Sequence, residues 1–365
     1  MPRRRPSILF YGAKSLALGM CKAVRELYPE YPIMGFLVTS REGNPAALAG
    51  LPVWDIESFH AGVGEEEKDG RHILIATPED LHPEIVRTIE SLGYHHFTCM
   101  DSAKEARLME RYFKRLGLFP SVRGLEPGRD KAGLWVVMAR FHKDRDLKSD
   151  YRPPEWVRPL QVGAALTDAR VAELLDNMGE NVSAKNVNYC ELTGLYWLWK
   201  NRLSVDPGGE GQYYGLFHYR RILDITEADL YRLGANDVDA VLQFPTLHEP
   251  SILEHHARYI PESDWEAMER ALAELRPEYA KALPAIMAQP YFYNYNLIIA
   301  KRRVLADYCA WLFPILERTE ALSTPKGWER RDRYIGYLGE SLMTLYFLYH
   351  KKDLKIYHAG RLMLT

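Results

Sequence analysis

Polar side chains that could bind a ligand are concentrated between Gln161 and Arg221. The densest group comprises Asp176, Asn177, Glu180, Asn181, Ser183, Lys185, Asn186 and Asn188, and the aromatic residues Tyr189, Tyr196, Trp197 and Trp199 follow it. This segment has neither the period of a half-buried strand nor that of an amphipathic helix. Polar groups beside large aromatic rings suit a pocket for a polar, ring-shaped ligand. We predict substrate contacts from Gln161, Asn177, Asn181, Lys185, Asn186 and Tyr189. The alternative is a loop in which Asn and Asp only form turns.

A strand with a charged end follows at residues 213–219. Its alternation places His218 and Arg220 on one face and Arg221 on the other. Ligands of open α/β sheets bind at the carboxyl ends of strands, and guanidinium forks suit phosphate oxygens. We therefore predict that Arg220 and Arg221 hold a diphosphate and that His218 is catalytic. The alternative is a surface arginine pair that binds nearby carboxylates.

Four runs of sequence resemble a known family. They are DNMGENVSAKNVNYCELTGLYWLWKN, GLFHYRR, YNYNLIIAKR and RYIGYLGESLMTLYF, and they occur in this order within residues 133–365. They resemble the family catalogued as domain of unknown function 4422, glycosyltransferases found among capsular and exopolysaccharide genes. The resemblance implies a GT-A-like α/β domain with a nucleotide-sugar donor, such as UDP-hexose or UDP-galactofuranose. It also implies a glycan or lipid-linked glycan acceptor and transfer with inversion.

Two further segments supply candidate site residues. The resemblance makes residues 134–141 the first strand of the transferase sheet, so His142 and Lys143 would lie near the nucleotide base. A strand over 292–300 would place Asn294 and Asn296 on one face, where they could recognise sugar hydroxyls. Asn residues that only satisfy one another in the core are the alternative.

A helix expected over 332–350 carries the best candidate for the catalytic base, Glu340. It shares a stripe with Arg333 and Gly336, and Arg333 is about 10 Å away along the axis, too far to pair with it. Glu340 has no charged neighbour at helical spacing. We therefore predict that Glu340 removes the acceptor proton and that Arg333 contacts the ligand, with Asp176 and Asp168 as competing bases.

Asp237-Val238-Asp239 has the form of a metal-binding DxD motif. It precedes the apolar strand 240–244, whereas a catalytic metal is expected past the carboxyl end of a strand. A divalent metal, Mn or Mg, is therefore possible but not favoured, and no metal ligand is assigned.

Residues 1–123 alternate strands with helices, which predicts a Rossmann-like parallel sheet ahead of a GT-A-like domain at 124–365. The boundary lies in the Gly- and Pro-rich segment 117–133. Gly12 and Ala13 form an incomplete dinucleotide fingerprint, and Arg41 stands where an acidic residue would bind ribose. These three are the candidate cofactor residues. A docking domain, an NAD(P)-dependent oxidoreductase and a non-catalytic sugar-nucleotide sensor are the alternatives.

The composition of the 365 residues, 47% hydrophobic and 26% charged, is that of a globular protein. A net charge of −2 gives no general attraction to nucleic acid. The four cysteines show no disulfide or zinc spacing, and no apolar run approaches the roughly 20 residues of a membrane span. We expect a cytoplasmic protein. Arg3, Arg4 and Arg5 leave peripheral contact with the inner membrane face as an alternative.

Overall fold

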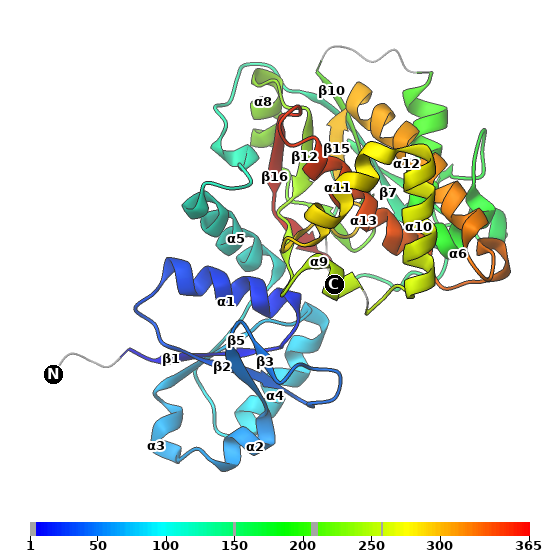
Figure 1. Cartoon of the computed structure of the whole chain (residues 1–365). Coiled ribbons are helices and arrows are strands. Elements are labelled where there is room, and N and C mark those ends of the chain that lie inside the picture. The colour runs from blue at the N-terminus through cyan, green and yellow to red at the C-terminus, as the bar shows by residue number, and fades with distance from the viewer. Residues whose placement is uncertain (1–4, 149–150, 206–210, 257) are drawn as a thin grey trace. The chain divides into compact units, whose positions relative to one another are not determined.

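The computed structural model describes residues 5–148, 151–205, 211–256 and 258–365 (Figure 1). The chain divides into two compact units, which we describe separately. The first comprises Met1–Leu118, Thr246–Glu249 and Thr365, and the second Phe119–Pro245 and Pro250–Leu364. The division falls between 118 and 119, close to the boundary that the sequence analysis placed between 123 and 124.

The first unit is built on a six-stranded sheet in the order β3-β4-β2-β1-β5-β6. All neighbours are parallel except β3, which is antiparallel to β4. The strands are β1 (Ser7–Tyr11), β2 (Ile33–Val38), β3 (Ala47–Leu48), β4 (Leu51–Asp55), β5 (Arg71–Ile75) and β6 (Phe97–Cys99). The helices are α1 (Ser15–Leu27), α2 (Ile56–Ala61), α3 (Glu65–Lys68), α4 (His82–Ser91) and α5 (Ser102–Leu116). The predicted parallel α/β sheet is confirmed.

The loop after β1 contains the predicted cofactor residues Gly12 and Ala13. Gly12 has a φ of +119°, and a Cβ there would lie 2.6 Å from the Ala76 carbonyl oxygen. The backbone conformation and the close packing of this turn therefore require glycine even without a bound cofactor. Ala13 is buried, and the Arg41 guanidinium donates a hydrogen bond to the Val53 carbonyl. A cofactor role for these residues stays a prediction.

The second unit has a mixed sheet in the order β16-β12-β15-β10-β7-β8-β9, and β11 and β17 extend it beside β10. Strands β10, β7, β8 and β9 are parallel neighbours, whereas β15 runs antiparallel to β10 and β12. The strands are β7 (Gly133–Arg140), β8 (Val157–Gln161), β9 (Leu174–Leu175), β10 (Gln212–His218), β11 (Arg221–Leu223), β12 (Ala240–Gln243), β15 (Ile298–Lys301), β16 (Ile356–Ala359) and β17 (Arg361–Met363). The second unit also contains the short strand β14 (Tyr291–Phe292), whereas β13 (Thr246–Leu247) belongs to the first unit. The predicted α/β class of this part is also confirmed.

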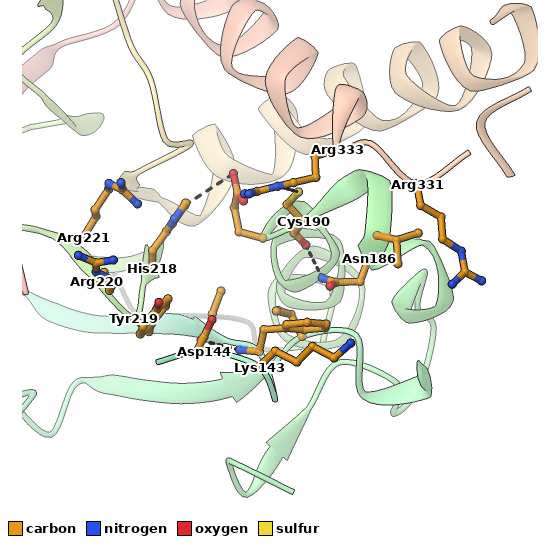
Figure 2. Close-up of a pocket in the computed structure, with 15 residues that line it drawn as sticks. Lys143, Asp144, Asn186, Cys190, His218, Tyr219, Arg220, Arg221, Arg331 and Arg333 are labelled. Atoms are coloured by element: carbon orange, nitrogen blue, oxygen red, sulfur yellow. Dashed lines mark hydrogen bonds and ion pairs between the residues drawn. The ribbon is translucent and has the colours of Figure 1, made fainter. Parts of the chain in front are cut away.

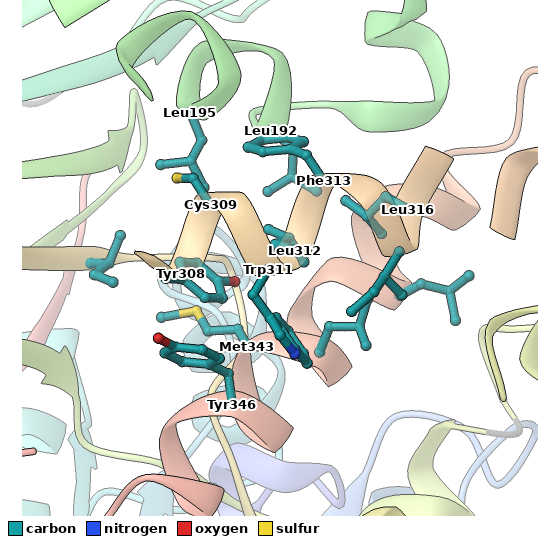
Figure 3. Close-up of a cluster of buried hydrophobic side chains, with 14 of the residues drawn as sticks. Leu192, Leu195, Tyr308, Cys309, Trp311, Leu312, Phe313, Leu316, Met343 and Tyr346 are labelled. Atoms are coloured by element: carbon teal, nitrogen blue, oxygen red, sulfur yellow. The ribbon is translucent and has the colours of Figure 1, made fainter. Parts of the chain in front are cut away.

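Helices of the second unit pack into one large apolar cluster (Figure 3). Leu312 and Leu316 of α12 (Arg302–Leu322) lie between Leu192 of α7 (Leu192–Leu198) and Met343 of α13 (Tyr334–Tyr349), and all are buried. Two helices follow one another closely here, α10 (Glu262–Leu275) and α11 (Pro277–Met287), because Pro277 begins a new helix. The remaining helices are α6 (Asn186–Tyr189), α8 (Glu227–Ala235) and α9 (Ile252–His256).

The predicted strand over 292–300 is interrupted. β14 ends at Phe292 and β15 begins at Ile298, and between them Tyr295 and Asn296 adopt left-handed φ values of 67° and 50°. Two successive left-handed residues turn the chain, so the period of two that would put Asn294 and Asn296 on one face is lost.

In the described part of the chain, none of the helices has both the length and the apolar character needed to cross a bilayer. Arg5 forms an ion pair with Glu30 at 2.9 Å and lies over the ring of Tyr31. Arg3 and Arg4 lie outside the described residues.

Candidate functional site

A cavity of about 520 Å³ opens at the carboxyl ends of β7, β8 and β10 (Figure 2). It is lined by Ala139, Phe141, Lys143, Asp144, Val162, Asn186, Val187, Cys190, Glu191, His218, Tyr219, Arg220, Arg221, Arg331 and Arg333. This is the sheet edge at which α/β proteins bind ligands. Six predicted site residues meet here, namely Lys143, Asn186, His218, Arg220, Arg221 and Arg333.

The lining of the cavity is predominantly cationic. Its charged side chains are Lys143, Arg220, Arg221, Arg331 and Arg333 against Asp144 and Glu191. Burial raises the pKa of Asp144 to about 6, so that this carboxyl ionises less readily than usual. The arrangement favours an anionic ligand, and guanidinium groups bind phosphate oxygens well.

Arg220 and Arg221 are placed by a tight hairpin. His218 pairs with Arg221 where β10 turns into β11, and Arg220 lies in the turn. The Arg221 guanidinium stacks on the Tyr295 ring at 4.3 Å, and Arg220 Nε donates to the Leu364 carbonyl at 3.4 Å. In Figure 2 both arginines lie on the His218 side of the cavity, while Arg331 lies on the opposite side. The hairpin explains why a strand that ends in HYRR presents two guanidinium groups together.

Glu191 is the acidic side chain that the sequence analysis missed. Only 10% of its side chain is exposed, and its Oε1 accepts a 2.6 Å hydrogen bond from Asn296 Nδ2. His218 Nε2 lies 3.6 Å from the same oxygen. Among the described residues nothing donates a hydrogen bond to Oε2, the oxygen that remains for a ligand. An acid directly before an apolar helix usually interacts with the helix N-terminus, so its sequence position did not distinguish Glu191.

Glu340 lies on α13 and is partly buried, but it is not among the residues that line the cavity. Burial and the neighbouring charge of Glu191 raise the pKa of its carboxyl to about 8, against the opposing effects of a Tyr295 backbone hydrogen bond, Arg221 and Arg333. Its role as the base stays a prediction. The small residues beside it serve helix packing, since a Cβ on Gly339 would lie 2.6 Å from Leu192.

His218 makes two contacts that fix its ring. Besides facing Glu191, it hydrogen-bonds to the backbone of Tyr295, and its burial lowers the pKa despite the Glu191 charge. Burial therefore favours a neutral imidazole.

Asp176 and Gln161 support loops. The buried Asp176 carboxylate accepts hydrogen bonds from the Gly163 and Ala164 amides at 2.8 and 3.0 Å, and from the Ser183 hydroxyl. The Gln161 side chain donates from Nε2 to the Ala169 carbonyl and accepts at Oε1 from the Val171 amide. Neither lines the cavity, and Asp168 is exposed on the adjacent loop. Their catalytic or binding roles stay predictions, and these contacts favour a structural role.

The other predicted binding residues lie around the cavity. Asn181 donates to the Asn177 and Gly179 carbonyls, Lys185 pairs with Glu320 at 2.5 Å, and Tyr189 donates to that same glutamate. Asn294 accepts from Gln243, Asn296 donates to Glu191, and the His142 ring lies 4.2 Å from the Phe141 ring, tilted by 52°. None of Asn177, Asn181, Lys185, Tyr189, Asn294, Asn296 or His142 is a lining residue. Direct substrate contact for these seven stays a prediction.

The segment 327–333, which presents Arg331 and Arg333, is held by buried contacts. Asn188 Nδ2 donates to the Gly327 and Arg330 carbonyls, and Asn188 Oδ1 accepts from the Asp332 amide. Arg333 begins α13 with a left-handed φ of 67°, and its Nε lies 3.3 Å from Cys190 Sγ.

The DxD-like pair lies at the amino end of β12. Asp237 pairs with Lys301 and Lys355, and Asp239 lies 3.5 Å from Lys301. In the ranges that the structure describes, no cluster of three or more His, Cys, Asp or Glu side chains could hold a metal ion.

The raised pKa of Glu340 predicts a pH-dependent stability. Between its ordinary value of 4.5 and its folded value of about 8, the folded chain binds more protons than the unfolded one. The free energy of unfolding that depends on the Glu340 proton is therefore highest below about pH 4.5, and it is lost as the pH rises through 8. The wild type should therefore lose stability relative to Glu340→Gln, which stays neutral, by on the order of 4 kcal/mol as the pH rises from 5 to 8.5. Urea unfolding measures this. The exposed Glu317→Gln is the control, and parallel wild-type and Glu340→Gln curves would contradict the effect.

Solved structures that match this chain include a glycosyltransferase. The apo structure of the bifunctional glycosyltransferase WbbM matches with 24% identity and a TM-score of 0.50, over 64% of this chain and 45% of that one. The chain thus spans less than half of that protein, and the match shows a shared fold. Glycerol-3-phosphate dehydrogenase from Saccharomyces cerevisiae matches at 9% identity over 95% of this chain and 82% of that one, and its TM-score of 0.19 supports no argument.

No curated protein sequence matches the chain. The family model described as domain of unknown function, DUF4422, matches residues 136–352, which include every residue that lines the cavity. This match covers more than half of the chain, and the protein therefore belongs to the DUF4422 family.

Proposed function

We propose that the protein is a glycosyltransferase that moves a sugar from a nucleoside diphosphate donor to a growing surface glycan. One observation carries the proposal: a single cavity combines the arginine pair at the end of β10 with the buried carboxylate of Glu191. The reaction requires positive groups that stabilise the anionic leaving group and a base that accepts the hydroxyl proton. The shared fold with a protein described as a bifunctional glycosyltransferase, and the DUF4422 match, support it.

Arg220 and Arg221 hold the donor diphosphate. Their planar forks bind phosphate oxygens in pairs, and they neutralise the charge that develops on the leaving group. Lys143 and Asp144, after β7, lie where the nucleoside would bind. The donor is a UDP-hexose or UDP-galactofuranose in this proposal, and the acceptor is a glycan or lipid-linked glycan.

The transfer is a direct displacement with inversion. The acceptor hydroxyl oxygen forms a bond to the anomeric carbon while the bond from that carbon to the diphosphate oxygen breaks. The electron pair of the broken bond leaves with the nucleoside diphosphate. The hydroxyl proton passes to a carboxylate in the cavity. Glu191 and Asp144 both line it, and Glu191 is the one that lies beside His218 and the arginine pair.

A thermal-shift screen tests the proposal. UDP-, GDP- and dTDP-sugars are compared with NAD(H) and NADP(H), because a ligand that binds only the folded state raises the melting temperature. A sugar nucleotide should stabilise the protein, and release of the nucleoside diphosphate should then be measurable. Stabilisation by a nicotinamide nucleotide alone would overturn the assignment, and donor binding without turnover would indicate a sensor.

We predict that Arg220→Lys or Arg221→Lys weakens binding of UDP about tenfold, because Lys keeps the charge and loses the fork. Titration of UDP by calorimetry measures this, with the exposed Arg318→Lys as the control. Treatment with EDTA should change turnover little if the arginines take the place of a metal. Activity that EDTA abolishes and manganese restores would contradict a metal-free site.

A further inference from the structure

The turn at Tyr295 and Asn296 connects three acid–base groups, His218, Glu191 and Glu340. The Tyr295 backbone hydrogen-bonds to both His218 and the Glu340 carboxyl, and the Asn296 amide donates to Glu191. A segment of two residues therefore contacts side chains from β10, from α13 and from the start of α7.

The turn is unfavourable by itself. Tyr295 and Asn296 are both left-handed, a conformation that side chains other than glycine adopt rarely. Asn296 is 1% exposed, and its Oδ1 is buried without a hydrogen bond while Nδ2 faces two acceptors, Glu191 Oε1 and the Gly336 carbonyl. If the Asn296 amide were turned so that Oδ1 and Nδ2 exchanged places, Oδ1 would face Glu191 Oε1 and the Gly336 carbonyl, which are also acceptors. Backbone strain and an unsatisfied polar atom persist where function requires them.

We propose that Asn296 is the positioning residue that determines which of two buried carboxylates is the base. An amide N–H₂ can only donate, so it favours an ionised Glu191, whose remaining oxygen is available to the acceptor hydroxyl. Glu340 is the protonated member of the two carboxyl groups. In the transfer, Glu191 takes the hydroxyl proton as the new glycosidic bond forms, and Glu340 keeps its own. This inference rests on the proposed function.

Other charged groups also face the carboxylate pair. His218 and Arg221 approach from the β10–β11 hairpin, Arg333 approaches from the start of α13, and Cys190 precedes Glu191. The positive charges of Arg221 and Arg333 favour the ionised form of either carboxyl group, so they do not distinguish the two acids. Of the two carboxyl groups, the Asn296 amide donates to that of Glu191, so it is the group that distinguishes the two acids.

Asn296→Asp tests this role. The variant replaces the donor with an acceptor 2.6 Å from Glu191 Oε1, so the carboxylates must share a proton. The acid limb of the pH profile of kcat/KM should move up by about one pH unit or more. The assay is release of UDP from UDP-galactose, or from the donor that the screen selects, with water as the acceptor. The matched control is Asn236→Asp, which makes the same change of a donor amide to an acceptor at a residue that donates to the Glu126 and Arg232 carbonyls and does not line the cavity. It should leave the limb in place. A lower rate for Asn296→Asp with an unmoved acid limb would show a purely structural role.

Infrared spectroscopy tests which carboxyl group holds the proton. It needs no enzymatic turnover, and it does not depend on whether the Asn296 variant folds. At neutral pH the wild type should show the carbonyl band of a protonated carboxyl, which Glu340→Gln abolishes and Glu191→Gln retains. A band that Glu191→Gln abolishes and Glu340→Gln retains would overturn the proposal. Binding of UDP by the same samples, measured separately, shows whether the proposed function itself fails.

Discussion

Glu191→Gln should lower the rate of sugar transfer by about 10²- to 10⁴-fold, the usual contribution of a general base. Gln keeps the shape of Glu191, and its oxygen can still accept the hydrogen bond from Asn296, so the local fold should survive. It cannot take a proton. Binding of UDP should change little, because the arginine pair that holds the diphosphate is retained. Steady-state kinetics beside UDP calorimetry separates these two effects.

Two further variants make this test specific. Glu180→Gln removes an exposed carboxylate of the same segment, which pairs with Lys200, and should leave turnover unchanged. Glu340→Gln should lower turnover much less than Glu191→Gln, since a neutral side chain resembles the protonated acid. If Glu340→Gln instead loses activity and Glu191→Gln keeps it, Glu340 is the base, as the sequence analysis predicted.

Regular elements of this fold were predictable because their patterns are local. The strand that ends in HYRR and the helix that carries Glu340 follow from alternation and helical spacing, and both occur within a residue or two. The position of Arg220 and Arg221 at the carboxyl end of β10 followed from the strand alone. The start of helix α11 also has a local signal, because Pro277 occupies its first turn.

The candidate site was harder to predict, because a polar residue type does not reveal which atom it contacts. Asp176 was predicted as a candidate catalytic residue, yet its carboxylate accepts from three groups of its own neighbourhood. Glu191 was overlooked, although it belongs to the same polar segment. The left-handed turn at Tyr295 has no signal in a run of alternating Tyr and Asn, because it forms only when the surrounding structure compensates its strain.

Asp264→Ala should destabilise the second unit by about 2–3 kcal/mol, less than the usual cost of breaking a buried ion pair on one side, because Arg330 keeps its ion pair with Asp332. Asp264 is fully buried, and Arg330 binds both of its oxygens at 2.7 and 2.8 Å. Once the carboxylate is removed, the Arg330 guanidinium, whose side chain is 12% exposed, loses these two hydrogen bonds. Urea unfolding of the full chain measures the change.

The matched control is Glu274→Ala, which breaks an exposed bidentate pair with Arg318 and should cost less than about 1 kcal/mol. Asp264→Ala should also weaken UDP binding, if Arg331 and Arg333 contribute to it, because Arg330 anchors the segment that presents them. Equal losses of stability in the two variants would show that the Arg330 pair is no more than a surface contact. A destabilised variant with unchanged UDP affinity would instead confine Asp264 to the fold and leave Arg220 and Arg221 as the groups that bind the diphosphate.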